Sequence, residues 1–131
     1  MATLGTKLQL TIAAGGLTRD ALNVSLSKNL TVTGKLGGVI KVTATSAGST
    51  ANIIYTEDDF AAPAYLFLYN TDTTATDYIF IYDDTTSGDP VIAKLAGGDF
   101  AFLPLNADKT LRAYATTNPT TLEYALFGTD Q

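Results

Sequence analysis

The chain contains no cysteine, no histidine and no tryptophan among its 131 residues. Without cysteine, neither a disulfide framework nor a thiolate metal site can form. Histidine is the commonest general base of enzymes, and cysteine is the most nucleophilic protein side chain. We therefore predict that the chain is not an enzyme and that it binds no cofactor and no metal ion.

Charged residues are also scarce, at 16% of the chain, whereas a typical domain has about 25%. The basic residues are spread singly and form no aromatic-interleaved groove, so we expect no nucleic-acid partner. The apolar runs are far too short to span a bilayer, so we expect no membrane segment. The start, MATLGTKLQLTIAAGG, does not have the pattern of a signal peptide, so we expect synthesis in the cytoplasm without export.

The few charges are distributed unevenly. Residues 1–56 carry five basic residues and one acidic residue, a net charge of +4. Residues 57–131 carry three basic and twelve acidic residues, a net charge of −9. We expect the two parts to attract each other, either within one subunit, which is the simpler arrangement, or between subunits.

Alternation of apolar and polar residues with a period of two dominates the sequence, which indicates β-strands. Turn signals rich in Gly, Asn and Asp separate these segments at intervals of about 8 to 14 residues, as in sandwiches and barrels. We expect a single all-β domain over residues 1–131, a jelly-roll-like β-sandwich of eight to ten antiparallel strands. A short helical turn at 18–22 is a lesser alternative. The expected strands cover residues 6–13, 22–27, 29–34, 37–45, 51–57, 64–70, 77–83, 90–96, 99–105, 110–117 and 121–128.

Two segments, AYLFLYN at 64–70 and DYIFIYD at 77–83, have two apolar faces, one aliphatic and one aromatic. A strand with one face in the core alternates apolar with polar residues, so the second apolar face needs a cover of its own. We predict that the aliphatic face lies in the core. The predicted core residues are Leu66, Leu68, Ile79 and Ile81, with Val39, Ile53, Val91, Phe100, Phe102, Leu111 and Leu122.

The same two segments could pair as a hairpin in which aromatic residues face aromatic residues. In a Greek-key arrangement they would instead lie in different sheets. The hairpin register pairs Tyr65 with Tyr82, Phe67 with Phe80, and Tyr69 with Tyr78.

The aromatic faces are the candidate binding surface. Six rings left half bare would expose roughly 450–750 Å², which reaches or exceeds the largest apolar patch of a typical monomer, about 300–600 Å². The cover could be another part of the same chain, a neighbouring subunit or a small ligand, and we favour the subunit. The predicted interface residues are Tyr65, Phe67, Tyr69, Tyr78, Phe80 and Tyr82.

Acidic residues offer the only alternatives for chemistry. A glycosidase needs two carboxyl groups across a cleft, but most of these residues fall in predicted turns, where Asp is expected for backbone reasons. The segment DDTTSGD at 83–89 departs from known calcium loops, and we expect a plain turn closed by Pro90. The acidic candidates are Glu57, Asp58, Asp59, Asp83, Asp84, Asp89, Asp99 and Glu123.

The strings APAYLFLYNT, LAGGDFAFLPL, LRAYAT and LEYALFG resemble the closing half of small virion structural proteins of tailed bacteriophages. The resemblance covers roughly residues 62–128, and LSKNLTVTG near the start is compatible with it. It implies a non-enzymatic virion protein, either a capsid decoration (cement) protein, which we favour, or a small tail or neck component. It further implies a homo-oligomer, with a trimer favoured, that contacts other virion proteins and takes no small-molecule substrate.

A carbohydrate-binding β-sandwich module is the alternative from a different functional class. Such modules combine Tyr platforms with acidic turns. They usually favour Trp, which this chain lacks.

Overall fold

A computed structural model describes residues 2–12, 22–42, 51–57, 60–84, 90–106, 108–116 and 120–129. Within these residues every regular element is a strand, and the ten strands all pair antiparallel, which confirms the all-β prediction. The chain divides into two compact units, Met1–Val32 and Thr33–Gln131, and each is described by itself. The expectation of a single domain stays a prediction.

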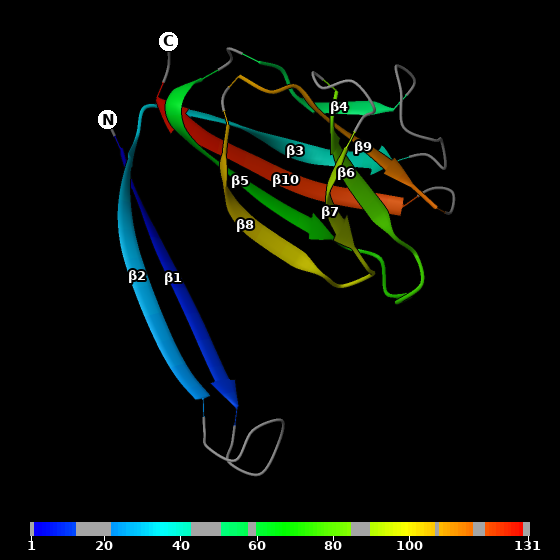
Figure 1. Cartoon of the computed structure of the whole chain (residues 1–131), viewed down its shortest axis with the longest axis horizontal. Coiled ribbons are helices and arrows are strands. Elements are labelled where there is room, and N and C mark those ends of the chain that lie inside the picture. Colours follow the sequence, from blue (N-terminus) through cyan, green and yellow to red (C-terminus); the bar gives the residue numbers. More distant parts are fainter. Residues whose placement is uncertain are drawn as a thin grey trace. The chain divides into compact units, whose positions relative to one another are not determined.

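The first unit is a ribbon of two strands, β1 (Ala2–Ile12) and β2 (Leu22–Val32) (Figure 1). The predicted break within residues 22–34 is wrong, because β2 runs through it: Lys28 pairs with Thr6, whose Oγ1 donates a hydrogen bond to the Lys28 carbonyl oxygen (2.9 Å). Most of the alternative helical turn at 18–22 lies outside the described residues; its last residue, Leu22, opens β2.

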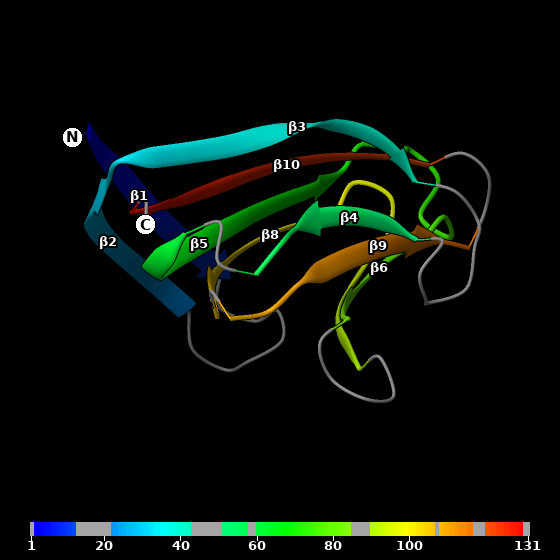
Figure 2. The same cartoon turned by 90° about the horizontal axis from the view of Figure 1, so that it is seen from above.

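The second unit contains two four-stranded sheets (Figure 2). Its strand pairs are nested: the first strand of the unit pairs with the last, the second with the second-last, and so on, and successive pairs alternate between the two sheets. One sheet has the order β3 (Gly34–Val42), β10 (Thr120–Thr129), β5 (Ala61–Asn70), β8 (Phe100–Leu105). The other has the order β4 (Asn52–Tyr55), β9 (Leu111–Ala115), β6 (Ile79–Asp83), β7 (Val91–Leu95).

Buried side chains of both sheets join in one hydrophobic cluster. The aliphatic faces of β5 and β6 lie in it, as predicted, because alternate residues of a strand point to the same side. The prediction is also correct for two further residues, one in β9 and one in β10. The confirmed core residues are Leu66, Leu68, Ile79, Ile81, Leu111 and Leu122.

Four other predicted core residues are exposed, so their assignment is wrong. Phe100 and Phe102 alternate with Ala101 and Leu103, which pack against the core and leave both rings on the outer face of β8. Hydrophobicity alone could not separate the two faces of β8, since both are apolar. The remaining exposed residues are Ile53 and Val91; the side chain of Val39 lies outside the described residues.

The predicted hairpin between residues 64–70 and 77–83 is also wrong. β5 pairs with β10 and β8, whereas β6 pairs with β7 and β9, so the two strands belong to different sheets. The alternative to the hairpin, in which the two segments lie in different sheets, is the one observed. The connection after β5 crosses from one sheet to the other.

Asn70 fixes this crossing. Its side chain is completely buried, and its Nδ2 donates hydrogen bonds to the carbonyl oxygens of Asp77 (2.8 Å) and Leu95 (3.1 Å). Its Oδ1 accepts a hydrogen bond from the backbone N–H of Asp72 (3.1 Å), an Asx turn. One side chain at the end of β5 therefore holds both the crossing loop and the end of β7 in the other sheet.

The segment AGGD at 96–99, one of the turn signals rich in Gly and Asp, forms the turn that joins β7 to β8. The Asp99 N–H donates to the Ala96 carbonyl oxygen (3.0 Å), and the Asp99 carboxylate accepts from the Ala96 N–H (2.9 Å). Gly98 has a φ of 84°, a conformation that favours glycine. A Cβ at Gly97 would lie 2.3 Å from the Thr74 carbonyl oxygen. Glycine is therefore required at both positions, at Gly98 by the backbone conformation and at Gly97 by the close approach of Thr74.

Candidate interaction surfaces

The six aromatic residues predicted as an interface fall into two groups on the outer faces of different sheets. Because Leu66 and Leu68 point into the core, the rings between them on β5 point outward. The same argument applies to β6, where Ile79 and Ile81 are buried. We name the first surface the β5–β8 aromatic face: Tyr65, Phe67, Tyr69, Phe100 and Phe102. We name the second the β6–β9 aromatic cluster: Tyr78, Phe80, Tyr82 and Tyr114.

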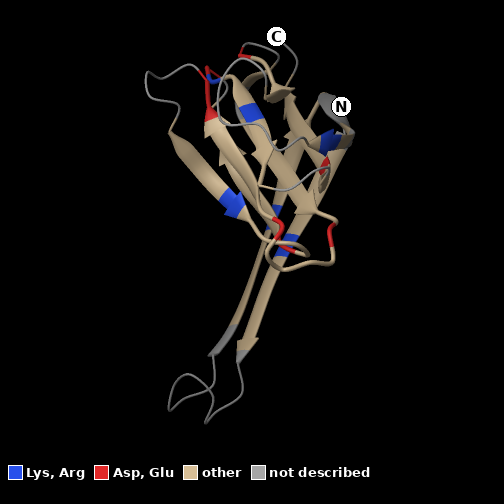
Figure 3. Cartoon of the chain, turned by 90° about the vertical axis from the view of Figure 1, so that its right-hand side faces the viewer, with Lys and Arg blue, Asp and Glu red and all other residues tan. Residues whose placement is uncertain are grey.

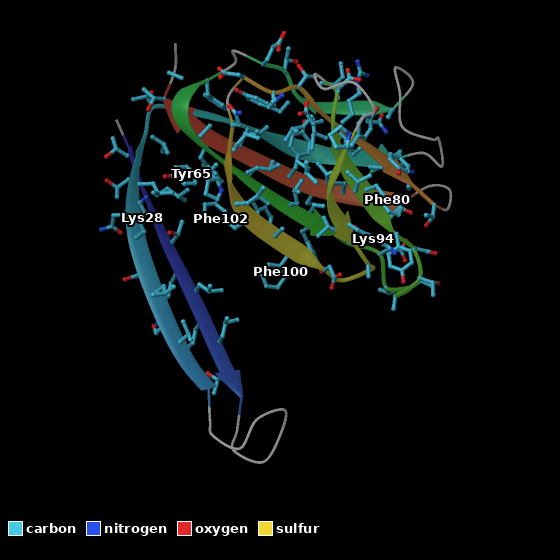
Figure 4. The ribbon with its side chains drawn as sticks, viewed as in Figure 1. Lys28, Tyr65, Phe80, Lys94, Phe100 and Phe102 are labelled. Atoms are coloured by element: carbon cyan, nitrogen blue, oxygen red, sulfur yellow. The ribbon has the colours of Figure 1, made fainter. Side chains whose placement is uncertain are left out.

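The β5–β8 aromatic face is built by cross-strand pairs in which Phe67 faces Phe102 and Tyr69 faces Phe100. The rings of Tyr65 and Phe102 stack with centroids 5.9 Å apart (Figure 4). Phe100 is 71% exposed and Phe102 41% exposed. These two rings alone leave roughly 170–280 Å² of aromatic surface open.

Strand β10 extends this face on the other side of β5. Ala125 lies opposite Phe67, and Phe127 lies opposite Tyr65. Glu123, opposite Tyr69, is exposed and is the charged residue that β10 adds here. The face is therefore largely apolar across three neighbouring strands.

β8 is an edge strand, and it carries Pro104 opposite Tyr65. Proline has no N–H to donate and is a common way to blunt a sheet edge. A partner is therefore expected to dock on the aromatic face rather than to add a strand beside β8.

The β6–β9 aromatic cluster has its cover within the chain. Phe80 stacks on Tyr114 with centroids 5.0 Å apart, and Tyr82, which is fully buried, meets the edge of Tyr114 at 5.8 Å. The Lys94 ammonium lies 3.8 Å from the centroid of the Tyr78 ring. Contacts within the chain therefore account for much of the burial of the β6–β9 aromatic cluster. A contact of this cluster with another subunit stays a prediction.

The sequence analysis did not predict that Phe100, Phe102 and Tyr114 lie on these outer surfaces. Phe100 and Phe102 share their strand face with Pro104, and the edge preference of proline was the available signal. Tyr114 alternates with the core residues Ala113 and Ala115 and follows Arg112 on the same outer face. That alternation in LRAYA marks Tyr114 as outward-facing.

The acidic candidates that the structure describes do not gather into one site. Asp83 pairs with Lys109 (3.1 Å), and Asp84 pairs with Arg112 (2.6 Å), which also donates to the Ala51 carbonyl oxygen (3.0 Å). The described acidic residues otherwise lie mainly at strand ends and in turns (Figure 3). Among the described residues, no three acidic side chains come together as a metal site would require.

Three of the remaining acidic candidates are among the described residues. Glu57 and Glu123 are exposed, and Asp99 closes the turn before β8. Three candidates lie outside the described residues, namely Asp58, Asp59 and Asp89.

A hollow of about 230 Å³ lies beside the loop after β5. It is lined by Thr71, Asp72, Thr73 and Thr121. Hydroxyl groups and one carboxylate could bind a polar molecule, but none of the described lining residues has an aromatic ring to stack on a sugar.

Within the described parts of the chain there is no helix with the length and apolar character needed to cross a membrane.

Comparison with known proteins assigns no family to the chain. No protein-family model matches it, and neither a curated protein nor a solved structure is significantly similar to it. The resemblance to phage virion proteins therefore rests on the sequence motifs.

Proposed function

We propose that the chain is a non-enzymatic structural protein of a bacteriophage virion, a capsid decoration protein that binds neighbouring subunits. The observation that carries the proposal is the β5–β8 aromatic face, where Phe100 is 71% exposed. Contiguous apolar patches on the surface of soluble proteins often belong to protein–protein contacts, and here Phe100 and Phe102 lie beside the half-buried rings of β5. Aromatic residues are also enriched among those that carry binding energy.

The proposal includes the fold of the Thr33–Gln131 unit, which we assign as a jelly-roll β-sandwich. The support is the strand order of this unit. Its antiparallel pairs are nested and alternate between two sheets, which is the arrangement of a jelly roll. The shared hydrophobic cluster supports face-to-face packing of the sheets. Jelly rolls are frequent in viral capsid proteins.

The first test is the mass of the purified protein in solution across a range of concentrations. We expect an oligomer, and Phe100→Ala should shift it toward monomer. The matched control is Ile53→Ala, which removes an exposed apolar side chain from the outer face of the other sheet. A protein that is monomeric at every concentration, or equal dissociation by both variants, would contradict the proposed interface.

The second test concerns location. An antibody raised against the chain should label the outside of purified phage particles in electron micrographs. Labelling confined to the tail or neck would replace decoration with the other virion location.

The second candidate function is carbohydrate binding, for which the polar hollow at Thr71 and the open ring of Phe100 are the supporting observations. A monomer that binds specific glycans on an array, and loses them with Phe100→Ala, would favour it. An oligomer without glycan binding would favour the virion protein.

A further inference from the structure

The β1–β2 ribbon has one apolar face and one polar face. The register pairs Leu4 with Leu30, Leu8 with Leu26, and Leu10 with Val24 on one side. The other side carries pairs such as Gln9 with Ser25 and Lys7 with Ser27. We name the first side the leucine face: Leu4, Leu8, Leu10, Val24, Leu26 and Leu30, interrupted by Thr6 and Lys28.

Half of the leucine face is open to solvent: Leu8 is 48%, Leu10 47% and Leu26 62% exposed. Leu4 and Val24 are half-buried, and Leu30 is buried. A two-stranded sheet by itself is at best marginally stable in water, and an amphipathic ribbon gains stability when its apolar face is covered. We therefore expect the leucine face to be covered by a binding partner.

We propose that the occupant is a second copy of the chain, which presents its β5–β8 aromatic face to the leucine face of its neighbour. This rests on the proposed function, which makes the aromatic face an assembly surface. Each copy then contributes one leucine face to one neighbour and one aromatic face to another.

Charge complementarity favours this partner. The Met1–Val32 unit carries three basic residues and one acidic residue, a net charge of +2, whereas Thr33–Gln131 carries five basic and twelve acidic residues, a net charge of −7. Contact between two leucine faces would instead bring two positively charged ribbons together. Opposite signs favour encounter and set the orientation of partners.

The available area points to a closed ring. Eleven residues at about 3.4 Å each make the ribbon about 37 Å long, and a width of roughly 10 Å gives a footprint near 370 Å². A stable interface needs about 800 Å² on each partner. One such contact is therefore smaller than a standard interface and weak by itself. In a closed ring each copy is held by two of these contacts at once, and a head-to-tail contact can close in this way.

The test uses the absence of native cysteine. Leu26→Cys and Phe102→Cys, each as a single variant with a different mass tag, are unfolded together and refolded as a mixture. They are then treated with a bismaleimide spanning about 10 Å, the spacing of stacked sheets. We expect the mixed crosslinked product to dominate, and to be lost when Ser25→Cys on the polar face replaces Leu26→Cys. Oligomers without the mixed product, or Leu26→Cys linked chiefly to itself, would overturn the proposal.

A pair of double variants tests the energetic role of the leucine face. Leu8→Asn with Leu26→Asn should raise the dissociation constant of the oligomer by about tenfold or more. Gln9→Asn with Ser25→Asn, the neighbouring pair on the polar face, should leave it unchanged. Circular dichroism should report a retained β fold for both.

The outcomes separate this inference from the proposed function. If Phe100→Ala dissociates the oligomer but the double leucine variant does not, the aromatic face remains an interface and the leucine face is not its partner. If Phe100→Ala leaves the oligomer intact, or if the unaltered protein is monomeric, the proposed interface fails and this inference fails with it.

Discussion

The β5–β8 aromatic face and the β6–β9 aromatic cluster begin from the same sequence pattern and end in different environments. Both strands alternate aliphatic with aromatic residues, and both bury the aliphatic side. Beside β6, Tyr114 and Lys94 pack against the rings. Beside β5, the neighbouring strand β8 contributes Phe100 and Phe102, which are themselves exposed. The neighbouring strand therefore decides whether an aromatic face is closed within the chain or left open for a partner.

The largest expected difference between the two surfaces is in folding stability. Tyr82→Ala should lower the free energy of unfolding by about 3–5 kcal/mol, because Tyr82 is fully buried and its removal leaves a cavity. Phe100→Ala should change it by no more than about 0.5 kcal/mol, as is usual for an exposed residue. Both are measured by urea unfolding, below the concentration at which the protein assembles. Similar losses for the two variants would end the distinction between a closed and an open surface.

Much of the fold could be predicted from the sequence because the relevant signals are local. The period of two identifies strands, and the aliphatic side of β5 and β6 identifies core residues such as Leu66 and Ile81. Gly and Asp in AGGD mark a turn whose backbone requires them.

Strand pairing could not be predicted in the same way, because it depends on contacts between residues far apart in the sequence. The aromatic match between β5 and β6 is good locally, yet each strand pairs elsewhere. In β8 both faces are apolar, so composition could not tell that Phe100 points outward while Leu103 packs against the core. The open part of the candidate surface was therefore assigned to the core.

The second prediction concerns the crossing that separates the two surfaces. Asn70→Ala should cost about 2–4 kcal/mol, because it leaves the buried carbonyl groups of Asp77 and Leu95 without their hydrogen-bond donor. Asn106→Ala is the matched control: Asn106 accepts a similar bond from the Asp108 N–H (3.2 Å) but is exposed, and its loss should cost less than about 1 kcal/mol. Urea unfolding measures both, and equal costs would show that the Asn70 anchor adds no stability.

The third prediction tests the cover of the β6–β9 cluster. Lys94→Met keeps the apolar stem but removes the ammonium group from the Tyr78 ring, and should cost about 0.5–1 kcal/mol. Lys41→Met makes the same change of charge at an exposed position of β3 and should have no such effect. If thermal unfolding is the same for both variants, the cation–π contact does not stabilise the cluster.

The smallest expected effect is on the rate of assembly, and it separates charge from apolar contact. Among the described residues Asp83 pairs with Lys109 and Asp84 with Arg112. Each pair takes up one acidic and one basic residue, so the net charge of −7 of the Thr33–Gln131 unit is unchanged and can attract a basic ribbon. Salt screens exposed charges over about 10 Å at 0.1 M and over about 3 Å at 1 M. Raising salt from about 0.05 M to 0.5 M should therefore slow association several-fold while the oligomer remains intact, because burial of apolar surface does not weaken with salt. Stopped-flow light scattering after dilution from denaturant measures this rate. If the association rate is unchanged and the oligomers are intact at both salt concentrations, assembly depends on apolar contact at the aromatic face and charge does not steer it.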